Sequence, residues 1–133
     1  MNPAYTLVAD RAEHRCEYCH APELVFNFPF EVEHIIPISK QGSNDDSNLA
    51  LSCRSCNLRK GNRTRGNDPV TQIETAFFHP RQQPWQDHFQ PNPITGEIGG
   101  LTAIGRSTAY YLDMNSPPQL AARQLWIQWN LFP

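Results

Sequence analysis

The chain has 133 residues, of which 39% are hydrophobic and 12 are proline, so it can form one compact domain with a modest core and many turns. Its formal net charge of −2 does not by itself indicate a nucleic-acid partner. No stretch approaches the roughly 20 apolar residues that span a bilayer, and the N-terminus lacks the basic and apolar regions of a secretion signal. This pattern argues against a membrane-spanning or exported chain, so we expect no membrane partner and a cytoplasmic location, where thiols stay reduced.

The first half of the chain contains short elements separated by turns. In chain order we expect an amphipathic helix over residues 5–15, a tight turn at 16–19, a strand over 30–36, a loop over 41–48, a second strand over 48–51 and a helix over 53–60. Pro37 ends the first strand because it has no amide hydrogen to donate, and Gly61 ends the second helix.

The second half changes character after Gly66 and is rich in Pro, Gly, Gln and Asn over residues 79–100. We expect a hairpin over residues 94–104 with Thr95-Gly96 at its turn, followed by helices over 106–114 and 118–129. These features predict a core formed by residues 1–66 and an extension, residues 67–133, that packs on it.

Four cysteines occur as two pairs with Cys-x-x-Cys spacing: Cys16, Cys19, Cys53 and Cys56. Two intervening residues let both sulfurs of one turn reach one ion, and two such turns complete a closed tetrahedral shell. A redox pair would need a thioredoxin-like βαβ pattern, which the sequence does not contain. We therefore expect a structural Zn²⁺ site, and a folded segment inside it because 33 residues separate the pairs.

An acid stands beside an imidazole in that segment, as Glu33-His34, and Asn57 directly follows the fourth cysteine. Carboxylate and amide oxygens are hard ligands for Mg²⁺ or Mn²⁺, and a neutral imidazole can accept a proton. Each feature also has a structural explanation, because Asn57 could cap the helix and Asn48 could bond its own backbone. Adjacent strand residues point to opposite faces, so Glu33 and His34 converge only where the backbone departs from ideal strand geometry, which Pro37 favours.

Five of the 11 basic residues fall within twelve positions that contain no acidic residue: Arg54, Arg59, Lys60, Arg63 and Arg65. A local basic cluster can bind the phosphates of nucleic acid although the whole chain is slightly acidic. The alternative is a solvated charged surface with no partner.

The order of these motifs resembles the HNH endonuclease family in its zinc-binding form with four cysteines. The shared pattern is Cys-x-x-Cys, acid-His-Ile-Ile-Pro, Gly-Ser-Asn, Asn-Leu, Cys-x-x-Cys-Asn and Lys-Gly, over residues 14–64, and the rest resembles the extension of small bacterial HNH proteins. The resemblance implies an α+β fold. Its core would be a ββα-metal, treble-clef-like HNH unit stapled by a four-cysteine zinc site, with a small α/β C-terminal extension.

The same resemblance implies functions for individual residues. His34 would be the general base, and Asn48 would brace the loop that orients its imidazole. Glu33 and Asn57 would bind a catalytic divalent ion, separate from the zinc held by the four cysteines. Glu33 stands where Asp is common, and Asn57 stands where some members have His. Glu33 and Asn57 both supply hard oxygen ligands, so we favour Mg²⁺ or Mn²⁺ as the catalytic ion.

The activity implied is that of a metal-dependent HNH endonuclease, a hydrolase of phosphodiester bonds in nucleic acid and above all in DNA. The alternative is a non-catalytic, zinc-stapled DNA-binding module with the same fold. A third interpretation makes the chain a toxin, a phage-defence effector or a piece of a larger machine, with the extension as its docking surface.

Overall fold

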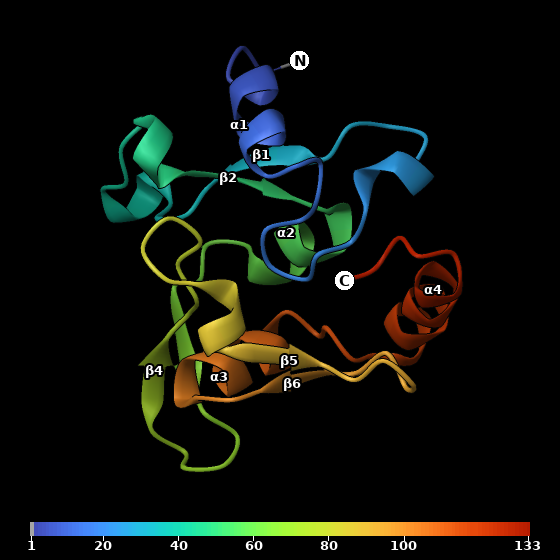
Figure 1. Ribbon diagram of the computed structural model, residues 1–133. Coiled ribbons are helices and arrows are strands. Elements are labelled where there is room, and N and C mark those ends of the chain that lie inside the picture. Colours follow the sequence, from blue (N-terminus) through green and yellow to red (C-terminus); the bar gives the residue numbers. More distant parts are fainter. Residues whose placement is uncertain (1) are drawn as a thin grey trace.

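The computed structural model describes residues 2–133, which form an α+β fold of four α-helices and three two-stranded antiparallel sheets (Figure 1). The elements are α1 (Tyr5–Arg11), β1 (Glu31–His34), β2 (Leu49–Ser52), α2 (Arg54–Lys60), β3 (Arg65–Asn67), β4 (Glu74–Ala76), β5 (Phe89–Pro91), β6 (Ile98–Gly100), α3 (Ala103–Tyr111) and α4 (Pro117–Gln128). None of the helices in this described range is long and apolar enough to cross a membrane. The expected α+β class is confirmed.

The β1–β2 hairpin followed by α2 forms the expected ββα unit. The two strands pair with Glu33 opposite Ala50 and with His34 opposite Leu49, and every residue of β2 is buried. Cys53 ends the hairpin and caps α2, because its sulfur accepts a hydrogen bond from the Cys56 amide. The predicted strands and the predicted helix are therefore present, in the order that the sequence indicates.

The first helix is shorter than expected, because α1 ends at Arg11 instead of continuing to Arg15. Glu13 and His14 both adopt a φ of 55°, in the left-handed region that side-chain-bearing residues rarely occupy. These two residues turn the chain out of the helix and lead it directly into the first cysteine pair.

The hairpin expected over residues 94–104 has different strands in the structure, but its turn is where the sequence predicts it. Its strands are β5 and β6, and the turn between them contains Gly96 at a φ of +79°. The hydroxyl of Thr102 accepts a hydrogen bond from the Gly105 amide, so α3 begins at Ala103, three residues before the helix expected from the sequence. The last helix, α4, begins with two prolines in its first turn, as predicted.

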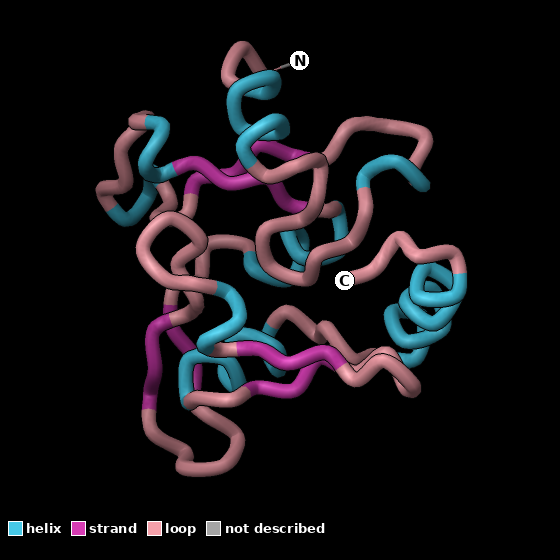
Figure 2. The backbone as a smooth tube through the Cα atoms, viewed as in Figure 1, coloured by secondary structure: helices cyan, strands magenta, loops and turns pink. Residues whose placement is uncertain are grey.

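One apolar core joins the two halves of the chain. It contains Val8, Tyr18 and Leu51 from the first half together with Phe89 and Leu112 from the second. Figure 2 shows how much of the backbone between these elements is loop. The division after residue 66 stays a prediction, and β3 lies across it because its strand runs from Arg65 to Asn67.

Candidate metal centre and active site

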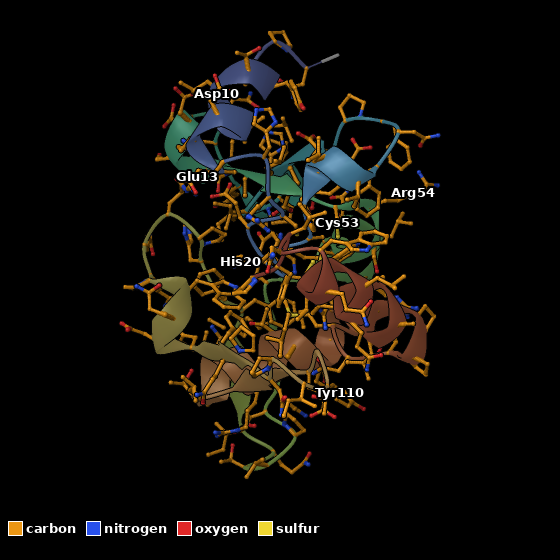
Figure 3. All side chains as sticks on the ribbon, turned by 45° about the vertical axis from the view of Figure 1, so that its right-hand side comes forward. Asp10, Glu13, His20, Cys53, Arg54 and Tyr110 are labelled. Carbon is orange, nitrogen blue, oxygen red and sulfur yellow. The ribbon has the colours of Figure 1, made fainter. Side chains whose placement is uncertain are left out.

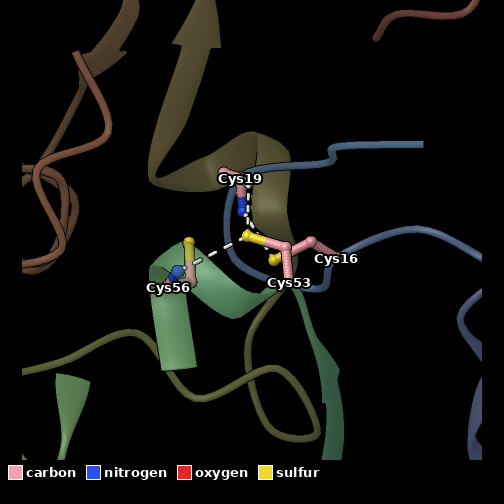
Figure 4. A group of neighbouring side chains, drawn as sticks. All are labelled: Cys16, Cys19, Cys53 and Cys56. Carbon is pink, nitrogen blue, oxygen red and sulfur yellow. Dashed lines mark hydrogen bonds between the residues drawn. The ribbon is translucent and has the colours of Figure 1, made fainter. Parts of the chain in front are cut away.

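The four cysteines converge on one buried site, although 33 residues separate the two pairs (Figure 4). Cys16 and Cys19 lie on the turn that follows α1, while Cys53 and Cys56 lie at the start of α2. All four are buried, none forms a disulfide, and their sulfur atoms lie within 4.8 Å of one another. The predicted convergence of both pairs on one point is confirmed.

The geometry of this cluster suits a tetrahedral zinc ion. Zinc–sulfur bonds of about 2.3 Å in a tetrahedron place the sulfurs about 3.8 Å apart, and the Cys19 and Cys53 sulfurs are 3.7 Å apart. Within each pair, a backbone amide also donates to a sulfur, from Cys19 to Cys16 and from Cys56 to Cys53. Such amides stabilise the thiolate form that binds a metal. The donor set could therefore hold a metal such as zinc.

A second site lies between the end of β1 and α2. A cavity of 380 Å³ is lined there by Val32, Glu33, His34, Pro37, Ile38, Ser39, Asn57, Gly61 and Asn62. The acid, the imidazole and the amide picked out from the sequence therefore border the same cavity. His34 is the last residue of β1, so the pair sits where the regular strand ends.

Glu33 is turned into the protein and is only 8% exposed. The hydroxyl of Tyr18, which lies between the first two cysteines, donates to one carboxylate oxygen of Glu33. The ammonium of Lys60 lies 3.0 Å from the other oxygen. Burial raises the pKa of the Glu33 carboxyl, while Lys60 and Tyr18 act in the opposite direction by favouring its charged form.

The imidazole of His34 has a defined hydrogen-bond partner. Its Nε2 atom lies 2.8 Å from the side-chain oxygen of Asn44. An amide oxygen can only accept a hydrogen bond, so this contact places the imidazole proton on Nε2 and leaves Nδ1 as the acceptor. Asn44 was not singled out from the sequence, where its polar loop offers no signal that distinguishes it from its neighbours.

The buried side chain of Asn48 holds the loop that follows His34. Its oxygen accepts from the Ile36 amide at 2.9 Å, and its nitrogen donates to the Ile36 and Ser43 carbonyls at 3.0 and 2.8 Å. Its own carbonyl accepts from the amide of Ile35 at 2.8 Å. Asn48 thus connects the start of β2 with the backbone on the C-terminal side of His34.

Four of the five clustered basic residues are exposed, as expected: Arg54, Arg59, Arg63 and Arg65. Figure 3 shows Arg54 at the edge of the molecule and Cys53 closer to its centre. Two of the four have acidic neighbours, since Arg59 lies 3.4 Å from Asp113 and Arg65 lies 3.0 Å from Glu74.

The prediction that Lys60 binds phosphates is wrong. Lys60 is 2% exposed, and its ammonium donates to the Glu33 carboxylate and to the carbonyls of His34 and Ile35. All three donors of the ammonium group are therefore used inside the protein. The sequence gives no signal for the contact of Tyr18 either. The position of Tyr18 between two cysteines is visible in the sequence, but its contact with the Glu33 carboxylate depends on the fold.

The model of the HNH endonuclease family matches residues 16–63 of the chain. This segment begins at the first cysteine and contains the ββα unit, all four cysteines and the cavity residues described above. No curated protein and no solved structure matches the chain. The match supports a nuclease or nucleic-acid-binding activity for this segment. The chain therefore carries, over residues 16–63, a domain of the HNH endonuclease family in the form with four cysteines placed to hold zinc.

Proposed function

We propose that the cavity between β1 and α2 is the active site of a metal-dependent endonuclease that hydrolyses phosphodiester bonds in DNA. The observation that carries this proposal is the meeting of Glu33, His34 and Asn57 at one cavity within the family-matched segment. A carboxylate, an imidazole and an amide are together sufficient to hold a divalent ion and to accept a proton from water.

Glu33 and Asn57 are the residues that would hold Mg²⁺ or Mn²⁺. Each oxygen of Glu33 accepts one hydrogen bond within the protein, and a carboxylate oxygen can take a second partner. No hydrogen bond among residues 2–133 engages the side-chain oxygen of Asn57, which is half-buried at the same cavity. When bound, the ion would stabilise the negative charge that grows on the phosphate during cleavage.

His34 would act as the general base. Its Nδ1 atom is the acceptor, because Nε2 is bonded to Asn44, and it would take one proton from a water molecule. The resulting hydroxide would attack the phosphorus atom opposite the leaving 3′ oxygen. Asn48 would contribute indirectly, by holding the loop after His34 in one conformation.

The exposed arginines on and after α2 would bind the neighbouring phosphates. Arg54 and Arg59 lie on the helix that also carries Asn57, and Arg63 follows it. Contacts of this kind position the nucleic acid without reading its sequence, and their contribution falls as salt rises. We therefore expect binding that depends strongly on ionic strength.

The test of the general base is the His34→Ala variant. Loss of the proton acceptor should slow DNA cleavage by roughly 10²- to 10⁴-fold, while zinc content and DNA binding stay at the wild-type level. Cleavage rate, zinc content and binding are measured side by side. His14→Ala is the matched control, because it removes an exposed imidazole that does not border this cavity and should cut normally. Wild-type cleavage by His34→Ala would end the assignment.

One observation favours the alternative of a DNA-binding module that does not cut. Tyr18 and Lys60 occupy both oxygens of Glu33, and Lys60 already supplies a positive charge beside that carboxylate. If a divalent ion does not join them, the domain retains its zinc site and its exposed arginines but has no catalytic centre. Cleavage that requires a divalent ion distinguishes the two functions.

A further inference from the structure

Arg123 on α4 is a buried cation without an acidic partner. Its side chain is 0% exposed, which makes it the largest fully buried side chain in the described part of the protein. Two of its nitrogens donate to backbone carbonyls, Nη1 to Gly96 and Nη2 to Met114, each at 2.8 Å. Its Nε has no hydrogen-bond partner, and no carboxylate in the described residues 2–133 lies within ion-pair distance of it. A buried charge in this state is costly unless a negative group compensates it.

The face of α4 that carries Arg123 points toward the second cysteine pair. Gln119 precedes Arg123 by four residues and so lies on the same face of the helix. The Gln119 amide donates to the hydroxyl of Ser55, which stands between Cys53 and Cys56 in the sequence.

The segment after α4 returns to the first cysteine pair. The guanidinium of Arg15, the residue before Cys16, donates to the Leu131 carbonyl at 2.7 Å. The next residue, Phe132, places its buried ring 5.6 Å from the guanidinium of Arg123. Residues before and after Arg123 in the chain therefore contact residues next to both cysteine pairs.

The cysteine cluster can supply the missing negative charge. Four thiolates around one Zn²⁺ leave two negative charges that the ion does not neutralise. Burial lowers the pKa of Arg123, and the four cysteines oppose that change electrostatically.

We infer that Arg123 is the charge partner of the zinc–thiolate centre, so that the C-terminal extension completes a metal site whose ligands all belong to the HNH domain. Groups outside the ligand shell commonly tune metal affinity in this way. The inference concerns the structural metal alone, and it holds whether or not the domain cuts DNA.

The experiment compares the rate at which zinc leaves the full-length, zinc-loaded protein. The variants are Arg123→Gln, which keeps a hydrogen-bond donor without charge, and Arg123→Lys, which keeps the charge without the planar fork. Zinc transfer to the chromogenic chelator 4-(2-pyridylazo)resorcinol is followed by absorbance. Arg123→Gln should release zinc roughly 10- to 100-fold faster than wild type, and Arg123→Lys should release it more slowly than Arg123→Gln.

The matched control is Arg106→Gln, in the same extension. Arg106 has its own carboxylate, because its Nε and Nη2 donate to Asp68 at 2.9 and 2.8 Å. The control removes the same charge and weakens the extension, yet it should release zinc at a rate close to that of wild type. Three results would overturn the inference: release from Arg123→Gln at the wild-type rate, release from Arg123→Lys as fast as from Arg123→Gln, or equal acceleration in Arg106→Gln.

Discussion

The buried ion pair between Lys60 and Glu33 fixes the orientation of the carboxylate at the candidate active site. Lys60 comes from the last turn of α2, and Glu33 comes from β1. Tyr18 adds a hydroxyl from the first cysteine turn to the same carboxylate. The side chain of Tyr18 thus connects the first cysteine turn with the carboxylate proposed to bind the divalent ion, so a change in one is expected to disturb the other.

Replacement of Lys60 with Met tests this ion pair. The variant leaves the Glu33 carboxylate buried without its cation, which should lower the free energy of unfolding by about 3–5 kcal/mol. Urea unfolding of the zinc-loaded protein measures the change. Lys40→Met is the control, because Lys40 is exposed and its loss should cost less than about 0.5 kcal/mol. Equal stability of the two variants would show that the pair does not stabilise the fold.

Residue spacing was enough to predict that the two cysteine pairs meet, but it did not predict that Tyr18 and Lys60 contact the carboxylate of Glu33. Two residues separate the cysteines of each pair, and this spacing fixes the geometry of each turn. Asn57 directly follows Cys56 in the sequence. Lys60, in contrast, stands among arginines in the sequence and looks like any other member of a basic cluster. Its burial depends on β1 lying beside α2, which is a tertiary contact that local sequence does not encode.

Among the elements, the loop between β1 and β2 determines how His34 is presented. Asn48, at the end of the short helical turn Asp46–Asn48, makes three side-chain hydrogen bonds to the backbone of this loop. Without the Asn48 side chain, the backbone amide and carbonyl of Ile36 would lose these hydrogen-bond partners. Asn48 therefore orders the loop without itself bordering the cavity.

Asn48→Ala should loosen this loop while the zinc site remains. Loss of partners for buried backbone groups costs about 1–3 kcal/mol for each unsatisfied group, so the unfolding midpoint in urea should fall. Hydrogen exchange at the Ile36 amide should become faster, because its acceptor is removed. Ser47→Ala changes the exposed neighbour and should leave both quantities unchanged. An unchanged exchange rate at Ile36 in Asn48→Ala would refute this explanation.

Elements with strong end signals were predicted better than elements without them. The cysteine cap and Gly61 mark the two ends of α2, and the prolines at the start of α4 mark its first turn. Strands β5 and β6 have three residues each, too few to establish a pattern of alternation. The positive φ angles that end α1 occur at Glu13 and His14, where the residue types give no signal for a turn.

In the whole molecule, the metal centre lies where the two halves of the chain meet. The core includes side chains from both halves, and the Arg15–Leu131 and Gln119–Ser55 hydrogen bonds join the C-terminal segment to the cysteine turns. The modest hydrophobic content of the chain makes such a staple important for stability. Sequence composition indicated a small core, but it could not show that the C-terminal segment contacts both cysteine turns.

Removal of zinc should therefore disrupt both halves together. Binding of a structural zinc ion contributes directly to folding, so a strong chelator should abolish the near-ultraviolet signals of aromatic side chains in the core and much of the helical signal. Circular dichroism with and without added zinc measures this, and restoration by zinc is the control. Persistence of the full helical signal after complete zinc removal would show that the extension folds independently of the metal.

The most direct test of the central claim is cleavage of supercoiled plasmid DNA by the zinc-loaded protein, with zinc content measured before and after the reaction. We expect nicked or linear product with Mg²⁺ or Mn²⁺, and none when a chelator removes these ions while the zinc stays bound. Plasmid that remains supercoiled with either ion, although the protein binds it and retains its zinc, would contradict the claim that Glu33, His34 and Asn57 form a nuclease site.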